Sequence, residues 1–444
     1  MTPRGSTSLP PRQVRRDGDR DVPTPPRAAT RHQSDPGTQT AMEAAITDHL
    51  REGMEYERNR SGPPEHFPQL PDIPGGRYVD PQFLALEDAQ LWKRSWLYAG
   101  HADELPEPGS FLMFTRTGSP IFLIRGKDLK VRAFYNTCRH RGGPLVKEAC
   151  GHTRGLVCGY HGWTYDFEGK LINLRDKRDF VGLDMHRRGL IEVRCEQLGN
   201  WIFINEDPDA EPLLEHLGPI PEYFAQYDID NIRFVKKDGV DVECNVKVLM
   251  DAFLEVYHLK SIHQHTVDRF LDHRGSKIVL WKNGHSLMLT PNRRPDWVDP
   301  GTVGMKQIPS VDELFAKNNP SFNLYPNLVT PMADSGMPFL LFWPTGPRSM
   351  RIECHWFAPD WGDGEPPALW ETRIANFERI LEEDTQFAPQ IQKSVESPGF
   401  KGMPLNYQER RIYHWHEELD RRIGRERVPE PLRVTPVLHD FVEG

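Results

Sequence analysis

The sequence has few cysteines, no long apolar run and no excess of positive charge. Only 6 of the 444 residues are Cys, which excludes a disulfide-rich secreted scaffold. No apolar stretch approaches the roughly 18 residues of a membrane-spanning helix, and the N-terminus lacks the apolar core of a signal peptide. Lys and Arg total 55 against 64 Asp and Glu, so a general nucleic-acid-binding surface is not indicated. We therefore expect a cytoplasmic protein that binds neither membranes nor nucleic acids.

The length and the composition predict a folded chain of two or three domains with an N-terminal extension. Residues 1–40 contain seven Arg, four Asp and seven Pro and hardly any large apolar residue, which is typical of a disordered tail. Residues 41–94 are expected to form a helical arm and a linker. The arm has apolar residues at helical spacing, namely Met42, Ile46, Leu50 and Met54.

The body of the chain changes character near residue 207. Residues 95–207 contain short apolar runs separated by turn residues, which predicts a small antiparallel all-β domain. Residues 208–444 mix strand-like runs with helical blocks, so we expect a larger α+β domain with an antiparallel sheet backed by helices. A long charged helix is expected over residues 368–395, with a kink or an end near Pro389.

Four metal-binding side chains occur in two short motifs. Cys138 and His140 form a C-x-H motif, and after residues 141–157 a C-x-x-H motif follows with Cys158 and His161. Zinc fingers usually pair Cys with Cys and His with His, whereas here each motif supplies one of each. This arrangement suits a Rieske [2Fe-2S] cluster, in which two Cys ligate one iron and two His the other. A zinc site is the less favoured alternative.

Glycines around both motifs favour tight turns with free backbone N–H groups, which could hydrogen-bond the sulfurs of such a cluster. The remaining cysteines have no histidine at ligand spacing and are interpreted as ordinary thiols: Cys150, Cys195, Cys244 and Cys354.

A second pair of histidines lies in a predicted helical block, residues 246–262. His258 and His263 are five residues apart, and on an ideal helix they would point about 140° away from each other. To share one metal, the helix must bulge or break between them, with Ser261 and Ile262 as the plausible places. Considered alone, such a pair is also common on an ordinary helix surface.

Both motifs resemble those of one family. The runs NTCRHRGGPL and CGYHGWTYDFEGKL resemble the Rieske domain of ring-hydroxylating oxygenase large subunits, and Tyr160 stands where cytochrome bc-type Rieske proteins have an extra Cys. The pattern E-x-x-H-x4-H at residues 255–263 is similar to the iron-binding signature of the same family. The resemblance implies a Rieske [2Fe-2S] domain at residues 95–207 and a catalytic mononuclear iron domain at residues 208–444.

The resemblance also implies the ligands of the mononuclear iron. His258 and His263 would be two of them, and a carboxylate on a distant helix would complete a 2-His-1-carboxylate triad. Asp384 best matches the family's position for this carboxylate, and Glu383 is the alternative. His265 is a rival histidine, but its distance from His258 does not match the family spacing.

Glu255 corresponds to the family's bridging acid, which is usually Asp. By resemblance it would hydrogen-bond His258 of its own iron site and a cluster histidine of a neighbouring subunit, giving electrons a route between the metals. The alternative is a Glu on a helix surface. A Glu at this position is a variant associated with the branch that acts on quaternary amines.

The resemblance implies the oxygenase component of a multicomponent enzyme, a Rieske-type mono- or dioxygenase. Electrons from NAD(P)H would arrive through a separate reductase or ferredoxin, because the sequence shows no Rossmann G-x-G-x-x-G fingerprint. The family implies a homotrimer, with or without a small β subunit.

The sequence leaves the substrate open. Residues 322–327 and 340–343 are apolar and aromatic, and as candidate pocket segments they favour an aromatic or other cyclic substrate. Hydroxylation or oxidative N-dealkylation of a quaternary amine is the alternative, because an aromatic cage uses the same residue types. A non-catalytic electron carrier is a more distant alternative.

Overall fold

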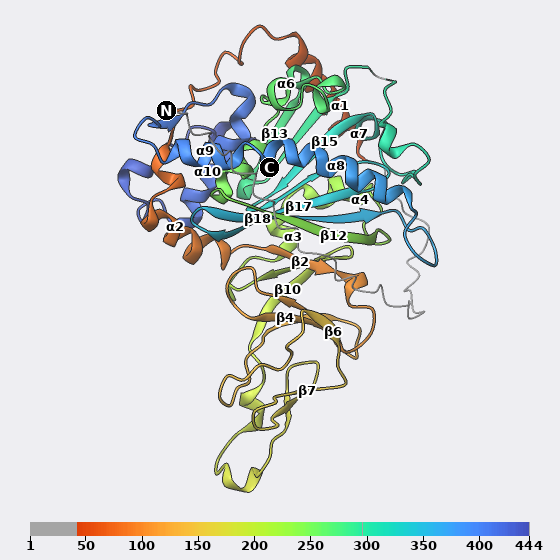
Figure 1. Cartoon of the computed structure of the whole chain (residues 1–444), viewed down its shortest axis with the longest axis vertical. Helices are drawn as coiled ribbons and strands as arrows, with labels where there is room; N and C mark the ends of the chain where they lie inside the picture. The colour runs from red at the N-terminus through yellow and green to blue at the C-terminus, as the bar shows by residue number, and fades with distance from the viewer. Residues whose placement is uncertain (1–41, 295, 444) are drawn as a thin grey trace, which may run out of the picture.

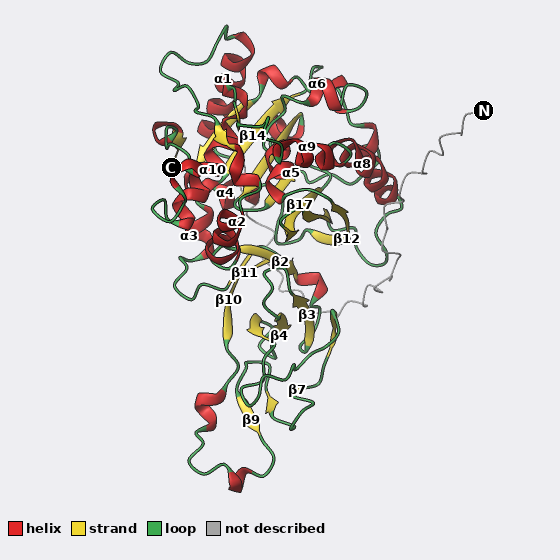
Figure 2. Cartoon of the chain, turned by 60° about the vertical axis from the view of Figure 1, so that its left-hand side comes forward, coloured by secondary structure: helices red, strands yellow, loops and turns green. Residues whose placement is uncertain are grey.

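The computed structural model describes residues 42–294 and 296–443, in which two β-sheet assemblies stand end to end (Figure 1). The predicted disordered tail, residues 1–40, lies outside the described residues. The smaller assembly forms the lower part of the molecule, and the larger one, which carries most of the helices, forms the upper part in both views (Figures 1 and 2). The predicted architecture, a small all-β domain followed by a larger α+β domain, is confirmed.

The lower part contains a seven-stranded antiparallel sheet with strand order β2-β11-β10-β5-β4-β3-β6. Its strands are β2 (Leu97–His101), β3 (Ser110–Phe114), β4 (Ile121–Arg125), β5 (Val131–Tyr135), β6 (Cys150–His152), β10 (Glu192–Leu198) and β11 (Trp201–Asn205). A three-stranded sheet below it contains β7 (Leu156–Val157), β8 (Thr164–Tyr165) and β9 (Leu171–Asn173). The apolar runs of the sequence become these strands because each is short and is followed by a turn.

The upper part contains an eight-stranded sheet with order β12-β18-β17-β16-β15-β14-β13-β20. Its strands are β12 (Arg233–Val242), β13 (Lys277–Trp281), β14 (Ser286–Pro291), β15 (Asn318–Leu324), β16 (Leu328–Pro331), β17 (Met337–Gly346), β18 (Ser349–Ala358) and β20 (Val442–Glu443). All neighbours are antiparallel except β13 and β20. Most residues of β17 and β18 are buried, as central strands covered on both faces require.

Helices cover this larger sheet. They are α1 (Ala44–Asn59), α2 (Pro81–Glu87), α3 (Leu213–Leu217), α4 (Ile220–Ala225), α5 (Val246–Phe253), α6 (Leu259–Ile262), α7 (Glu313–Ala316), α8 (Leu369–Thr385), α9 (Ala388–Val395) and α10 (Arg410–Ile423). The predicted apolar face of the arm is present on α1, where Leu50 and Met54 are buried. None of the described helices is long and apolar enough to span a membrane.

The long charged helix is divided as Pro389 predicts. Helix α8 ends at Thr385, and Pro389 lies in the first turn of α9. Proline is tolerated there because the first N–H groups of a helix have no partner inside the helix.

The prediction of one helical block over residues 246–262, broken at Ser261 or Ile262, is wrong. Helix α5 ends at Phe253, and α6 begins only at Leu259, so the break precedes His258. The carboxylate of Glu255 accepts backbone N–H groups of Tyr257 and His258, which replaces the helical hydrogen bonds at this point.

A single apolar core joins the two parts of the molecule. The ring of Trp201 in β11 lies 4.6 Å from the ring of Phe339 in β17, measured between centroids, and Tyr98 in β2 lies 5.2 Å from the same ring. A separate small core lies under the loops that carry the C-x-H and C-x-x-H motifs, and it includes Cys138, Cys158 and Trp163. These loops therefore stand on a support of their own at the lower end of the molecule.

Candidate metal centres

Two loops of matching backbone geometry carry the four Rieske-type side chains. The N–H of Cys138 donates to the carbonyl of Gly143, and the N–H of Gly142 donates back to Cys138. The second loop repeats this pattern, because Cys158 donates to Trp163 and the N–H of Gly162 donates to Cys158. Gly142 and Gly162 have φ of 76° and 72°, which explains why both turns contain glycine.

The two loops bring these four side chains close to one another. Both thiols are buried, each cysteine being 3% exposed, and the rings of His140 and His161 lie 4.5 Å apart between centroids. A Cβ added to Gly143 would lie 2.9 Å from the sulfur of Cys158, so the first loop packs directly against the second. Two buried thiols with two half-buried imidazoles are the donor set of a Rieske cluster, and the residues present fit it.

Tyr165 and Trp163 surround these side chains. The hydroxyl of Tyr165 lies 3.3 Å from the sulfur of Cys138 and accepts the backbone N–H of Arg139 at 3.0 Å. The indole of Trp163 stacks on His140, with centroids 4.9 Å apart and planes inclined by 7°. The phenol is therefore placed to donate to a thiolate sulfur, and the indole fixes the plane of one imidazole.

The upper part contains the second cluster, formed by His258, His263 and Asp384. One potential ligand atom from each residue lies within 4.8 Å of the others. A carboxylate oxygen of Asp384 is 3.1 Å from Nε2 of His263 and 3.5 Å from Nε2 of His258. The two histidines occupy the two ends of the one-turn helix α6, and Asp384 lies in the last turn of α8.

Each histidine of this cluster has its own carboxylate on the opposite side of the ring. Nδ1 of His258 hydrogen-bonds Glu255, and Nδ1 of His263 lies 2.6 Å from Glu383. Burial lowers the pKa of both imidazoles, but the neighbouring carboxylates outweigh it and raise both pKa values above the ordinary range. Because each Nδ1–H is engaged, Nε2 is the atom left to bind a metal, and the donor set fits a 2-His-1-carboxylate iron site.

The structure thus places the predicted side chains in two groups. The four candidate ligands of the [2Fe-2S] cluster lie in the lower part, and the three candidate ligands of the mononuclear iron lie in the upper part. Glu255 hydrogen-bonds Nδ1 of His258, and its role as a bridge to a cluster histidine of another subunit stays a prediction. Glu383 hydrogen-bonds the outer nitrogen of His263, whereas Asp384 faces the inner one. His265 is exposed and does not join the three-residue cluster.

Sequence reasoning missed Thr266 and Tyr165, which contact Glu383 and Cys138 respectively. Thr266 lies just beyond the predicted signature and carried no signal of its own. Tyr165 lies inside the CGYHGWTY run, where an aromatic residue seven positions after Cys158 was visible but its direction was not.

The two predicted pocket segments lie in β15 and β17 and in the turn after β15, in the interior of the larger sheet. Phe342 packs against Phe253 of α5, with centroids 5.1 Å apart, on the side of the helix that leads to His258. Phe322 instead packs against Phe224 and Tyr223, at 5.0 and 5.9 Å. Phe322 is therefore a core residue, and Phe342 belongs to the layer between the sheet and α5.

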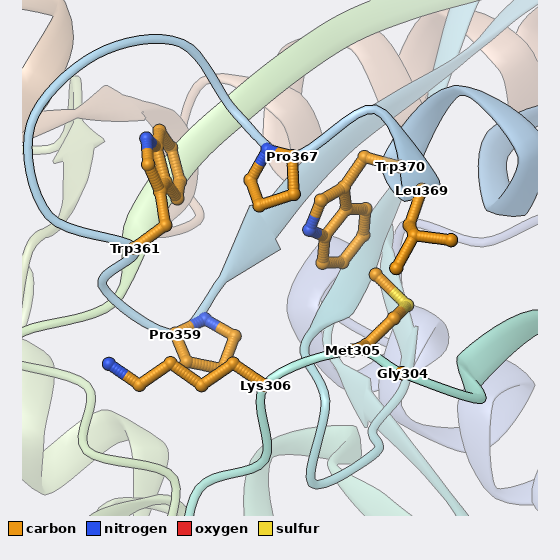
Figure 3. A pocket seen from close by; sticks show the side chains of 8 residues that line it. All are labelled: Gly304, Met305, Lys306, Pro359, Trp361, Pro367, Leu369 and Trp370. Carbon is orange, nitrogen blue, oxygen red and sulfur yellow. The ribbon is translucent and has the colours of Figure 1, made fainter.

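An apolar hollow opens at the other end of α8 (Figure 3). Trp361, Pro367 and Trp370 line it on one side, and Met305 and Lys306 lie opposite. Leu369, the first residue of α8, also lines it, and Asp384 follows fifteen positions later, about 22 Å along the helix axis. This hollow is therefore separate from the three-residue cluster.

Comparisons with known proteins match both parts of the chain. The Rieske [2Fe-2S] domain matches residues 95–185, and the ring hydroxylating alpha subunit (catalytic domain) matches residues 229–425. The glycine betaine monooxygenase oxygenase subunit of Chromohalobacter salexigens is 29% identical over 207 residues, which is 45% of each chain. The biphenyl dioxygenase subunit alpha of Metapseudomonas furukawaii is 31% identical over 194 residues, 41% of this chain and 42% of the relative. These matched segments thus span less than half the length of either relative.

Solved structures show the same fold over a larger part of the chain. The apo form of the quaternary ammonium Rieske monooxygenase CntA has a TM-score of 0.65 at 20% identity, covering 82% of this chain and 99% of that one. Naphthalene 1,2-dioxygenase from Rhodococcus has a TM-score of 0.66 at 19% identity, covering 87% and 100%. With both family domains in the family's order and the two donor sets in place, the chain belongs to the Rieske non-haem iron oxygenases, as a large (alpha) subunit.

Proposed function

We propose that this chain is the oxygenase component of a Rieske oxygenase system that hydroxylates a small organic molecule. Overall, a C–H bond of the substrate, O2, two electrons and two protons would give the hydroxylated product and water. The observation that carries the proposal is the presence of both donor sets in one chain, with the three ligand-type side chains of the upper set within 4.8 Å of one another.

In this proposal Cys138, His140, Cys158 and His161 hold the [2Fe-2S] cluster, and His258, His263 and Asp384 hold the mononuclear iron. When bound, the cluster supplies single electrons and the iron activates O2. The protein holds the Nδ1 protons of both iron-ligand histidines on carboxylates, so that each Nε2 keeps its lone pair.

The proposed electron route crosses between chains. The Rieske loops lie at the lower end of the molecule and α6 lies at the upper end, with both sheets between them (Figures 1 and 2). This separation supports the proposal that Glu255 bridges to a cluster histidine of a neighbouring copy in a homotrimer, with or without a small β subunit. Electrons would arrive from NAD(P)H through a separate reductase or ferredoxin in the cytoplasm.

Two substrate classes follow from different observations. A quaternary amine is favoured by the Glu at position 255 and by the similarity of the chain to two relatives, a glycine betaine and a carnitine monooxygenase oxygenase subunit. An aromatic or other cyclic compound is favoured by the match to a biphenyl dioxygenase subunit and by the aromatic side chains next to α5. We propose the quaternary amine as the first class to test.

The experiment begins with anaerobically purified protein. It should show a Rieske visible spectrum and about three iron atoms per chain, two in the cluster and one mononuclear. About two iron atoms would indicate an electron carrier, and zinc without iron would overturn the proposal.

Turnover is then measured as O2 uptake with a surrogate reductase. Trimethylammonium carboxylates form one arm of the substrate panel, and biphenyl-type and other cyclic compounds form the other. Oxidation of a carbon attached to nitrogen gives a carbinolamine that breaks into an aldehyde and a smaller amine, so aldehyde release identifies the amine class. A hydroxylated ring identifies the cyclic class, and no product from either arm would contradict both assignments.

A further inference from the structure

Consecutive residues of α8 reach the two nitrogens of the same imidazole. Asp384 lies 3.1 Å from Nε2 of His263, and Glu383 lies 2.6 Å from Nδ1. We infer that Glu383 is a positioning residue for the mononuclear iron, which holds His263 and Thr266 against α8 and is not itself an iron ligand. This inference rests on the proposed iron site. The proposed function itself gives Glu383 no role, since Asp384 is the carboxylate ligand there.

The hydrogen bonds of Glu383 define its task. One carboxylate oxygen accepts both the Nδ1–H of His263 and the hydroxyl of Thr266, each at 2.6 Å. Glu383 therefore serves as an acceptor that attaches two residues of one segment, His263 and Thr266, to α8.

The two carboxylates of α8 fix the orientation of the His263 ring. Successive residues of an α-helix point about 100° apart, so the side chains of Glu383 and Asp384 diverge and enclose the ring from its two nitrogen-bearing edges. With the Nδ1–H donated to Glu383, Nε2 keeps its lone pair on the side of Asp384, whereas a flipped ring or the other tautomer would leave Glu383 without its N–H donor. An acceptor on Nδ1 also makes Nε2 a stronger donor to a metal.

Glu383 connects two separate helices, whereas the contact of Glu255 with His258 is local. Glu255 lies three residues before His258 and in the same segment, so their hydrogen bond is local. Glu383 lies 120 positions after His263 and on another helix, so its bonds attach the end of α6 and the residue Thr266 to α8. The position of one iron ligand relative to another thus depends on this contact.

The test compares Glu383→Ala, Glu383→Gln and Thr266→Val with the wild-type full chain. Glu382→Gln is the matched control, because Glu382 is the neighbouring exposed residue of the same helix. Fe(II) affinity is measured by competition with a chelator, and the electron paramagnetic resonance spectrum of the nitric oxide adduct reports the ligand geometry. The visible spectrum of the Rieske cluster shows that the lower domain is intact, and circular dichroism with thermal unfolding shows that the upper domain of each variant is folded.

Removing such a contact typically lowers metal affinity about 10–100-fold, which we expect for Glu383→Ala, together with a changed nitric oxide spectrum. Glu383→Gln should recover part of the affinity because its amide oxygen still accepts hydrogen bonds, and Thr266→Val should lose less than Glu383→Ala. Glu382→Gln should remain within about twofold of the wild type.

Three results would overturn the inference. Wild-type affinity and spectrum in Glu383→Ala would show that the contact is unimportant. Loss of iron in Glu383→Gln with retention in Asp384→Ala would make Glu383 the ligand. A wild-type protein that binds its cluster but no mononuclear iron would refute the proposed function itself, and the inference with it.

Discussion

An oxygen of Asp384 lies 3.1 Å from Nε2 of His263, although 121 positions separate the two residues in the chain. Replacement of Asp384 by Ala removes the only carboxylate of the three-residue cluster. We expect the variant to lose the mononuclear iron and turnover while keeping the cluster spectrum, so that iron falls from about three to about two atoms per chain. Glu382→Ala on the same helix is the control, and retained turnover in Asp384→Ala would refute the assignment.

Glu255→Gln tests the proposed electron route. The amide oxygen can still accept the Nδ1–H of His258, so both metals should remain bound. Loss of the negative charge should slow electron transfer between cluster and iron in a single-turnover measurement. Equal single-turnover rates in variant and wild type would remove the bridging role.

Tyr165→Phe tests how the protein sets the potential of the cluster. The lost hydroxyl lies 3.3 Å from the sulfur of Cys138, where a donated hydrogen bond stabilises the more negative reduced cluster. A net hydrogen bond of about 0.5–1.5 kcal/mol corresponds to about 20–65 mV for one electron, so the reduction potential should fall by up to that amount.

Voltammetry of the cluster measures this shift. Tyr135→Phe is the control, since that hydroxyl donates to Glu206 and not to a cluster ligand. An unchanged or raised potential in Tyr165→Phe would show that the phenol does not donate to the cluster.

The buried His216 predicts a loss of stability in acid. Burial, with help from Arg422 and Arg421, lowers its pKa from 6.5 to about 3. Between these values the unfolded chain binds a proton that the folded chain does not, so the free energy of unfolding decreases as the pH falls from 6.5 toward 3. One such proton lowers the free energy of unfolding by about 1.4 kcal/mol for each pH unit.

Urea unfolding at pH 7, 6 and 5 measures this dependence. His216→Gln should unfold with a weaker dependence on pH over this range, whatever its stability at pH 7. An equally steep dependence in the variant would show that His216 is not the group responsible.

Much of the fold and of the candidate site could be predicted from the sequence. The C-x-H and C-x-x-H motifs are local, so their spacing already indicates two equivalent loops, and Pro389 marks the division between α8 and α9 because proline acts on its own backbone. The break before His258 could not be predicted, since it depends on the Glu255 side chain replacing helical hydrogen bonds. Likewise, the different roles of Glu383 and Asp384 depend on how α8 is rotated against α6, and adjacent acidic residues carry no signal of that rotation.

The hydrogen bonds that Glu255 and Glu383 form with the two histidines involve no metal. The protein itself therefore holds both imidazoles, so we expect removal of the iron with a chelator to leave the fold intact and Fe(II) to restore the site.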